Sequence, residues 1–131
     1  MIGLDTNVLV RYIAQDDPAQ SARATAFVEK ECSPSSPGFV ALVVLVEVVW
    51  VCERCYGATR AEITEILRTI CSSKQLVVQD AEPAWQALRL FESTKADFAD
   101  ALIERTASAA GCERVVTFDK HAAQSGMVLL R

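Results

Sequence analysis

Four acidic residues stand out because each lies where a predicted strand ends, where a predicted helix begins, or inside an apolar segment. They are Asp5, Glu47, Asp100 and Asp119. Asp5 and Asp119 each follow a short apolar segment, so both carboxylates are expected at the end of a strand. Carboxylates that gather at one place repel one another, and a hard divalent cation with oxygen ligands, Mg²⁺ or Mn²⁺, is the usual compensation. The pattern therefore predicts a site for such a cation.

Glu47 is the only charged residue in the apolar segment 39–52. An unpaired carboxylate in the protein interior is costly, so a buried Glu47 must be protonated, paired with a cation or bound to a metal. An ion pair with an arginine, or a helix face that reaches solvent, would also account for it. Both alternatives remain open from the sequence.

Asp97 and Asp100 stand three residues apart at the start of a predicted helix. Asp97 is placed where an aspartate can cap the free amide groups of a helix, and Asp100 lies in the first turn, where negative charge suits the helix dipole. For Asp97 we therefore keep two interpretations, helix cap and site acid. Asp5 and Asp119 could each be turn residues, and Asp119 could also cap a helical turn that begins at Lys120.

The periodicity of apolar residues predicts short strands that alternate with helices. Expected strands are 2–4, 39–41, 75–79, 114–118 and 127–130. Expected helices are 6–13, 18–32, a buried helix at 42–55, 60–72, 81–94, 98–110 and a turn at 120–124. Thr59 and Glu62 are expected to form a capping box, Asp80 to cap the helix that follows it, and Gly111 to end the helix before it in the left-handed conformation. Such alternation predicts an α/β protein, a mainly parallel sheet covered by helices on both faces.

In a sheet of this kind, ligands bind at the carboxyl ends of the strands. Asp5 and Asp119 would therefore lie at the same edge if the strands that precede them are neighbours. With 131 residues, of which 51% are hydrophobic, the chain fits one domain over residues 1–131. The first residues do not resemble a secretory signal, and the longest apolar segment is too short to span a bilayer, so we expect a cytoplasmic protein without a membrane segment.

The charge and the cysteines limit the function classes. The 17 acidic and 13 basic residues give a net charge of −4, but with the four acids and Asp97 set aside, 12 acidic residues remain against 13 basic ones. The acidity is thus concentrated in the predicted metal site, and a nucleic-acid substrate is compatible with it. The five cysteines are expected to be reduced, and the pair Cys52 and Cys55 is expected to be structural.

Four segments together resemble PIN-domain proteins, specifically the VapC-type toxins of bacterial toxin–antitoxin systems. They are IGLDTNVLVR (2–11), VEVVW (46–50), DFADALI (97–103) and VTFDK (116–120). The resemblance covers essentially the whole chain. It implies a three-layer α/β/α sandwich and metal-dependent cleavage of RNA by Mg²⁺-activated water.

The resemblance also implies roles for particular residues. Asp5, Glu47, Asp100 and Asp119 match the four acids that bind the metal and carry the reaction, and Asp97 matches an additional acid of one subgroup. The polar residues that accompany those acids, and that would order ligands or water, are Thr6, Asn7 and Thr117. A cognate antitoxin and a homodimer are implied as partners, and for Trp50 and Trp85 we expect core packing rather than an interface.

Other interpretations compete with this one. A phosphatase of the haloacid dehalogenase type needs a second aspartate two residues after the first, but Asn7 stands there. A receiver-like Mg²⁺-binding signalling module would carry paired acids early, and a glutamate inside a helix does not fit it. A free-standing or non-catalytic PIN-domain protein that only binds RNA remains an alternative.

Overall fold

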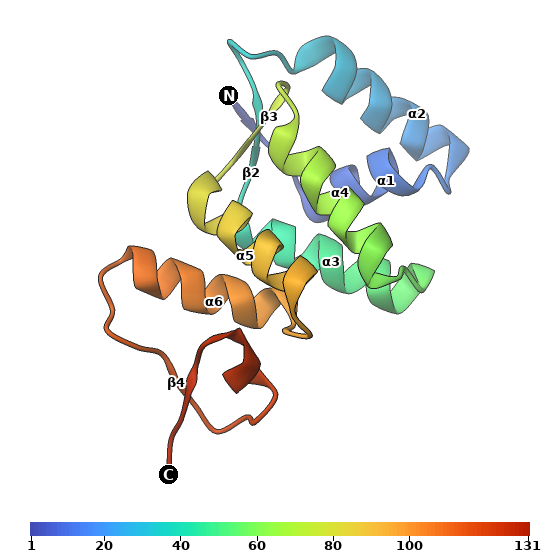
Figure 1. The fold of residues 1–131 in the computed structure, drawn as a ribbon. Coiled ribbons are helices and arrows are strands. Elements are labelled where there is room, and N and C mark those ends of the chain that lie inside the picture. Colours follow the sequence, from blue (N-terminus) through green and yellow to red (C-terminus); the bar gives the residue numbers. More distant parts are fainter. The chain divides into compact units, whose positions relative to one another are not determined.

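The computed structural model describes all residues from Met1 to Arg131. They form two compact units, Met1–Gln79 and Asp80–Arg131, and each is described by itself. The first contains β1 (Ile2–Gly3), α1 (Thr6–Ala14), α2 (Pro18–Ala26), a π-helical segment (Phe27–Glu31), β2 (Gly38–Val40), α3 (Leu42–Tyr56), α4 (Arg60–Ser72) and β3 (Leu76–Val78) (Figure 1). The second contains α5 (Ala81–Ser93), α6 (Phe98–Ala109), β4 (Val116–Thr117), a 3₁₀ turn (Ala122–Ser125) and β5 (Val128–Leu129).

The first unit is built on a parallel sheet with the strand order β1-β2-β3. Each crossover between neighbouring strands carries helices, as parallel strands require. Gly38 begins the middle strand because a Cβ atom there would lie 2.9 Å from Leu4 Cδ1 and 3.1 Å from Leu76 Cδ2. The absence of a side chain at Gly38 thus lets the leucines from both sides of β2 close over it.

Helix α3 begins at the carboxyl end of β2, and polar groups of the neighbouring strand fix its start. Gln79, directly after β3, accepts a hydrogen bond from the backbone N–H of Leu42 through its side-chain Oε1 (3.0 Å). Gly57 ends the helix in the left-handed conformation (φ 61°), which favours glycine. The sequence prediction of a helix rather than a long strand in this segment is confirmed, but the helix is buried on one face only, because Val43 and Trp50 are exposed.

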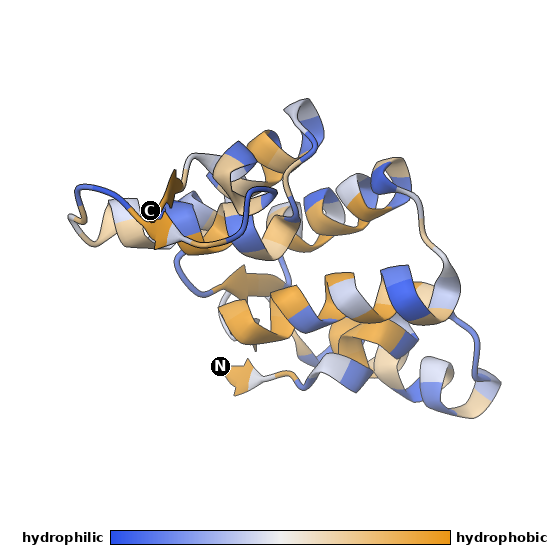
Figure 2. Ribbon diagram, turned by 90° about the horizontal axis from the view of Figure 1, so that it is seen from below, coloured by the Kyte–Doolittle hydropathy of each residue, from blue (hydrophilic) through white to orange (hydrophobic).

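Hydrophobic side chains of the helices and of β2 form the core of the first unit. Fully buried examples are Leu9, Val28, Val40, Leu45, Val48, Ile63 and Leu67. Hydrophobic and hydrophilic residues alternate along the helices in Figure 2, so that each helix has an apolar face to bury. Burying one such leucine contributes about 2 kcal/mol to folding, and this packing is what holds the site residues on α1 and α3.

In the second unit, α5 packs against α6 and two short strands run parallel to each other. The rings of Phe91 and Phe98 meet edge to face, with centroids 6.2 Å apart and an interplanar angle of 88°. Strands β4 and β5 pair in register from Val116 with Val128. Helix α6 ends before Gly111, whose φ of 96° matches the left-handed residue that the sequence predicts.

The predicted elements are all present, with differences at their ends. The mixed α/β class with parallel strands is confirmed. The prediction of one domain over 1–131 stays a prediction, as does the adjacency of the strands before Asp5 and Asp119. Two local expectations differ from the structure. The helix that begins at Pro18 changes to π-helical hydrogen bonding after Ala26, and Asp80 precedes α5 with φ 48° and makes no side-chain capping hydrogen bond.

Candidate metal centre

Asp5 lies at the carboxyl end of β1, directly before α1. The backbone N–H of Leu4 donates to the carbonyl of Phe39 (2.9 Å), which extends the pairing of β1 with β2 up to this point. Asp5 is extended (φ −79°, ψ 158°) and occupies the N-cap position of α1, but its side chain makes no capping hydrogen bond. Its carboxylate is exposed and is therefore free to bind a ligand.

Glu47 is joined to the start of α1 by a side-chain hydrogen bond. The hydroxyl Oγ1 of Thr6 donates to Glu47 Oε1 at 2.8 Å, across a separation of 41 residues. Thr6 is buried, so this hydrogen bond holds the Glu47 carboxylate from its buried side. Thr6 thus lies next to Asp5 in the chain and bonds to Glu47, while its role in ordering ligands or water stays a prediction.

The expectation that Glu47 itself is buried is wrong. Glu47 is exposed on α3, whereas Val48 and Val49 next to it are buried. Every residue of the segment 39–52 except Glu47 is apolar, so the sequence does not show which face of the helix is exposed to solvent. Of the two alternatives, the structure fits a helix face that reaches solvent. An exposed Glu47 needs no ion pair with an arginine.

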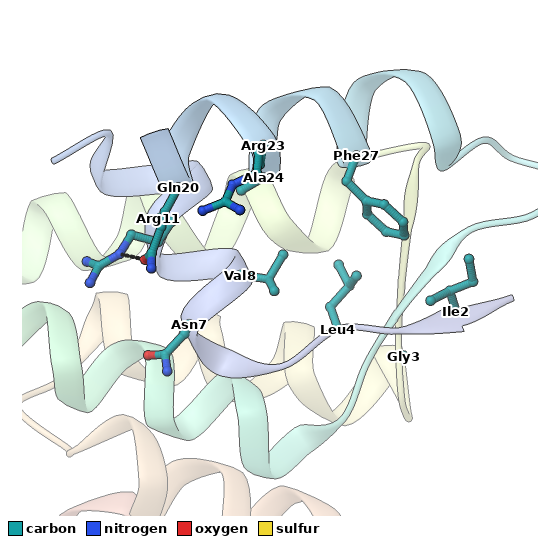
Figure 3. Close-up of a pocket in the computed structure, with 10 residues that line it drawn as sticks. All are labelled: Ile2, Gly3, Leu4, Asn7, Val8, Arg11, Gln20, Arg23, Ala24 and Phe27. Atoms are coloured by element: carbon teal, nitrogen blue, oxygen red, sulfur yellow. Dashed lines mark hydrogen bonds between the residues drawn. The ribbon is translucent and has the colours of Figure 1, made fainter. Parts of the chain in front are cut away.

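A pocket of about 450 Å³ lies between β1, α1 and α2 (Figure 3). Its lining is largely apolar and includes Leu4, Val8 and Phe27, and the guanidinium of Arg23 lies over it. Asn7 lines the pocket but points its amide away from that apolar lining. Asn7 is exposed, one residue after Thr6, and can donate to or accept from a ligand near Asp5.

The second unit brings three more acids together. Asp97 and Asp100 lie at the start of α6, and Asp119 follows β4. His121, two residues after Asp119, lies with Nε2 3.5 Å from Asp97 Oδ1 and so connects the turn after β4 with the start of α6. No role for His121 was predicted from the sequence, although its position two residues after Asp119 was a usable signal.

The pKa of Asp100 is raised above the ordinary value of an aspartate. Partial burial is the largest cause, and the negative charges of Asp97 and Asp119 add to it, while His121 acts in the opposite direction. A raised pKa means that the ionised form is disfavoured in the metal-free protein. A cation near Asp100 would reverse this effect.

Asp119 has a structural role as well. Its side-chain Oδ1 accepts from the backbone N–H of His121 (2.8 Å), and its own N–H donates to Thr117 Oγ1 (3.0 Å). The Asp119 side chain thus holds the backbone of the turn after β4, but the 3₁₀ turn begins at Ala122 with His121 at its N-cap position and has no side-chain cap. The other carboxylate oxygen of Asp119 remains for a ligand. Asp97 makes no side-chain capping hydrogen bond, whereas Asp17 at the start of α2 accepts from Gln20 N–H at 3.0 Å.

The donor atoms suit a hard divalent cation. Carboxylate oxygens, with threonine and asparagine beside them, are the ligands that Mg²⁺ and Mn²⁺ prefer. Within either unit, no group of three or more carboxylate, imidazole and thiolate side chains has the spacing of a preformed metal site. Asp97, Asp100 and Asp119 are nevertheless close enough for their charges to shift the pKa of Asp100, so the chemistry of the set fits the ion.

Parallel strands with helical crossovers in the first unit, and acids that follow β1 in the first unit and β4 in the second, define an α/β protein with acidic candidate site residues in both units. The family model of the PIN domain matches residues 2–126, and the chain therefore belongs to the PIN domain family. PIN domains are generally nucleases that use divalent metal ions. No curated protein matches the chain, and no helix in the structure is long and apolar enough to cross a membrane.

Proposed function

We propose that this protein is a metal-dependent endoribonuclease that hydrolyses RNA phosphodiester bonds, and that it is the toxin of a type II toxin–antitoxin pair. The grouping of Asp97, Asp100 and Asp119 in the second unit, where His121 Nε2 lies 3.5 Å from Asp97 Oδ1, is the observation that carries the proposal. Partial burial, together with the charges of Asp97 and Asp119, raises the pKa of Asp100 and supports it. Grouping three acids is electrostatically unfavourable without a cation, so a surface with only a structural role is not expected to contain such a group. Membership of a family of nucleases supports the reaction class.

In this proposal Asp5, Glu47, Asp100 and Asp119 hold the ion, which is Mg²⁺ or in its place Mn²⁺. When bound, the ion lowers the pKa of its water and stabilises charge on the phosphate. Thr6 holds the Glu47 carboxylate through its hydroxyl, and Thr117 holds the backbone of Asp119. Asn7 lies beside Asp5 with a free amide that can orient a phosphate oxygen or a water molecule.

The test uses purified protein, a labelled RNA and Mg²⁺. Cleavage is expected from the wild type and should stop with a chelator. The variants D5N and D100N should lose at least 100-fold in rate, since each removes a charged ligand while keeping the shape. Asp17→Asn is the matched control: it makes the same chemical change at a helix cap outside the site, and asparagine caps as well as aspartate.

The same D5N variant separates the alternatives in cells. A toxin that cleaves RNA should arrest growth when it is expressed, and D5N should not. If D5N arrests growth as strongly as the wild type, the protein acts by binding RNA or a partner without cleavage. If no RNA is cut by the wild type under any metal, the nuclease proposal is wrong. The cognate antitoxin and the homodimer belong to the proposal too, and co-expression with the product of an adjacent short reading frame should suppress the arrest.

A further inference from the structure

One face of α3 carries exposed residues, of which only Glu47 has a role in the proposed reaction. Going along the helix, this face contains Val43, Glu47, Trp50 and Arg54, which are separated by four, three and four residues and are all exposed. At 100° per residue the four lie within about 60° of one another. We call this set the α3 stripe. Trp50 is 54% exposed and Val43 is 66% exposed, so the expectation that Trp50 packs in the core is wrong.

Trp50 and Arg54 form a pair on this stripe. The guanidinium carbon of Arg54 lies 5.4 Å from the centroid of the Trp50 ring, a distance at which a cation is attracted to the face of an aromatic ring. The guanidinium thus rests on an aromatic ring rather than on a carboxylate, and its donors are available to an anion. A large flat ring and a fixed positive charge lie side by side in solvent.

Glu47 places this pair next to the candidate metal centre. Trp50 follows Glu47 by three residues, which is about 4.5 Å along the helix axis. The hydrogen bond from Thr6 holds the Glu47 carboxylate in place on the N-terminal side of Trp50. A ligand strand that runs along the α3 stripe would therefore contact Glu47, then the Trp50 ring and then the Arg54 guanidinium.

We propose that Trp50 and Arg54 form a subsite for single-stranded RNA, in which an unpaired base stacks on the Trp50 ring and Arg54 binds a neighbouring phosphate. The inference rests on the proposed function and adds to it a feature of the substrate, since only an unpaired base can reach the ring. Aromatic rings beside cations are the usual means by which proteins hold single strands without reading their sequence. An interface between two copies would favour a stripe depleted of charge, whereas two of these four residues are charged.

The experiment measures binding separately from cleavage. Trp85 is the only other tryptophan, so the variant W85F leaves Trp50 as the single fluorophore. An unstructured oligouridine is titrated into this variant at low ionic strength with a chelator present. Saturable quenching of the Trp50 fluorescence is expected. A fully paired RNA duplex of the same length should quench much less.

Variants at the subsite then test each part. With binding followed by the anisotropy of a labelled oligouridine, Trp50→Ala should weaken affinity roughly five- to hundredfold, and Trp50→Phe should recover part of the loss. Arg54→Ala should weaken binding and lower the slope of log affinity against log salt by about 0.7, the value for one phosphate contact on a single strand. Lys74→Ala, at an exposed lysine between α4 and β3, is the control for loss of one positive charge.

Several outcomes would overturn the inference. Unchanged affinity of the Trp50→Ala variant would do so, as would equal losses for Arg54→Ala and Lys74→Ala. If Trp50→Ala instead converts a dimer to a monomer in sedimentation and leaves RNA affinity unchanged, the stripe is a contact between copies. Because no metal is present in the binding assay, a protein that binds through Trp50 but never cleaves RNA would keep the subsite and disprove only the proposed function.

Discussion

At the scale of single residues, the structure separates acids that serve the fold from acids that do not. Asp17 and Asp119 accept backbone N–H groups with their side chains, whereas Asp5 and Asp97 stand at helix starts without doing so. The identities of the candidate site residues could be predicted from the sequence because local motifs carry them. The exposure of Glu47 and Trp50 could not, since it depends on which face of a valine-rich helix is covered.

Outside the site, Asp16 gives a pH-dependent prediction. Its pKa is lowered, chiefly by the hydrogen bond from the Tyr56 hydroxyl (2.5 Å), and Arg11 lies 3.1 Å away. A lowered pKa adds stability that is present above the ordinary value of an aspartate and is lost as the pH falls through the lowered one. Tyr56→Phe should therefore raise the pKa of Asp16 toward that ordinary value, as followed by NMR titration of the carboxyl carbon. An unchanged titration would show that Tyr56 does not hold Asp16.

At the scale of elements, the starts of α2 and α4 follow from local capping chemistry. Thr59 and Glu62 form the capping box that the sequence predicts, with Thr59 Oγ1 accepting from Glu62 N–H (3.2 Å) and Glu62 Oε1 accepting from Thr59 N–H (2.9 Å). The left-handed conformation of Asp80 was not predictable, since no glycine marks it. The strands proved shorter than their valine and threonine content suggests, because pairing partners and not propensity decide where a ladder ends.

The capping box of α4 gives a prediction on stability. Thr59→Ala removes the side-chain acceptor for Glu62 N–H, and the free energy of unfolding should fall by about 1 kcal/mol. Urea unfolding followed by circular dichroism measures this change. Thr69→Ala, at an exposed position of the same helix where the hydroxyl only bonds back to Glu65, is the control and should cost much less. Equal losses would mean that the cap contributes nothing specific.

At the scale of the whole molecule, the balance of charge links the fold to the proposed ion. The net charge of −4 becomes nearly neutral without the five acids of the proposed site, and in the second unit the negative charges of Asp97 and Asp119 already disfavour ionisation of Asp100. The α/β class, the parallel strands and the family could all be recognised from the sequence, because they depend on periodicity and on motifs spread along the chain. The three acids and His121 of the second unit were harder to bring together, since their contact depends on how the turn after β4 folds back.

This balance predicts that divalent ions stabilise the protein. An ion that binds only the folded state adds about 2.7 kcal/mol at a concentration 100 times its Kd, and each kcal/mol corresponds to about 4 °C in Tm for a chain of this length. Mn²⁺ or Mg²⁺ should therefore raise the Tm of the wild type by several degrees in calorimetry. The rise should be much smaller for D5N and D100N but unchanged for D17N. A rise that all variants share would indicate general screening of charge.

The π-helical segment that follows α2 has a consequence for the length of the chain. Its backbone bonds skip one residue more than those of an α-helix, as from Cys32 N–H to the carbonyl of Phe27, so the segment holds one amino acid that an uninterrupted α-helix would not need. The wide turn absorbs that amino acid, so its deletion would allow α-helical bonding throughout with little change in the direction of the later side chains. If the extra residue stayed and the bonding became α-helical, every later side chain would turn by about 100° around the axis and Cys32 would leave its buried position. The π-helical bonding thus preserves the phase at which the chain enters the sheet.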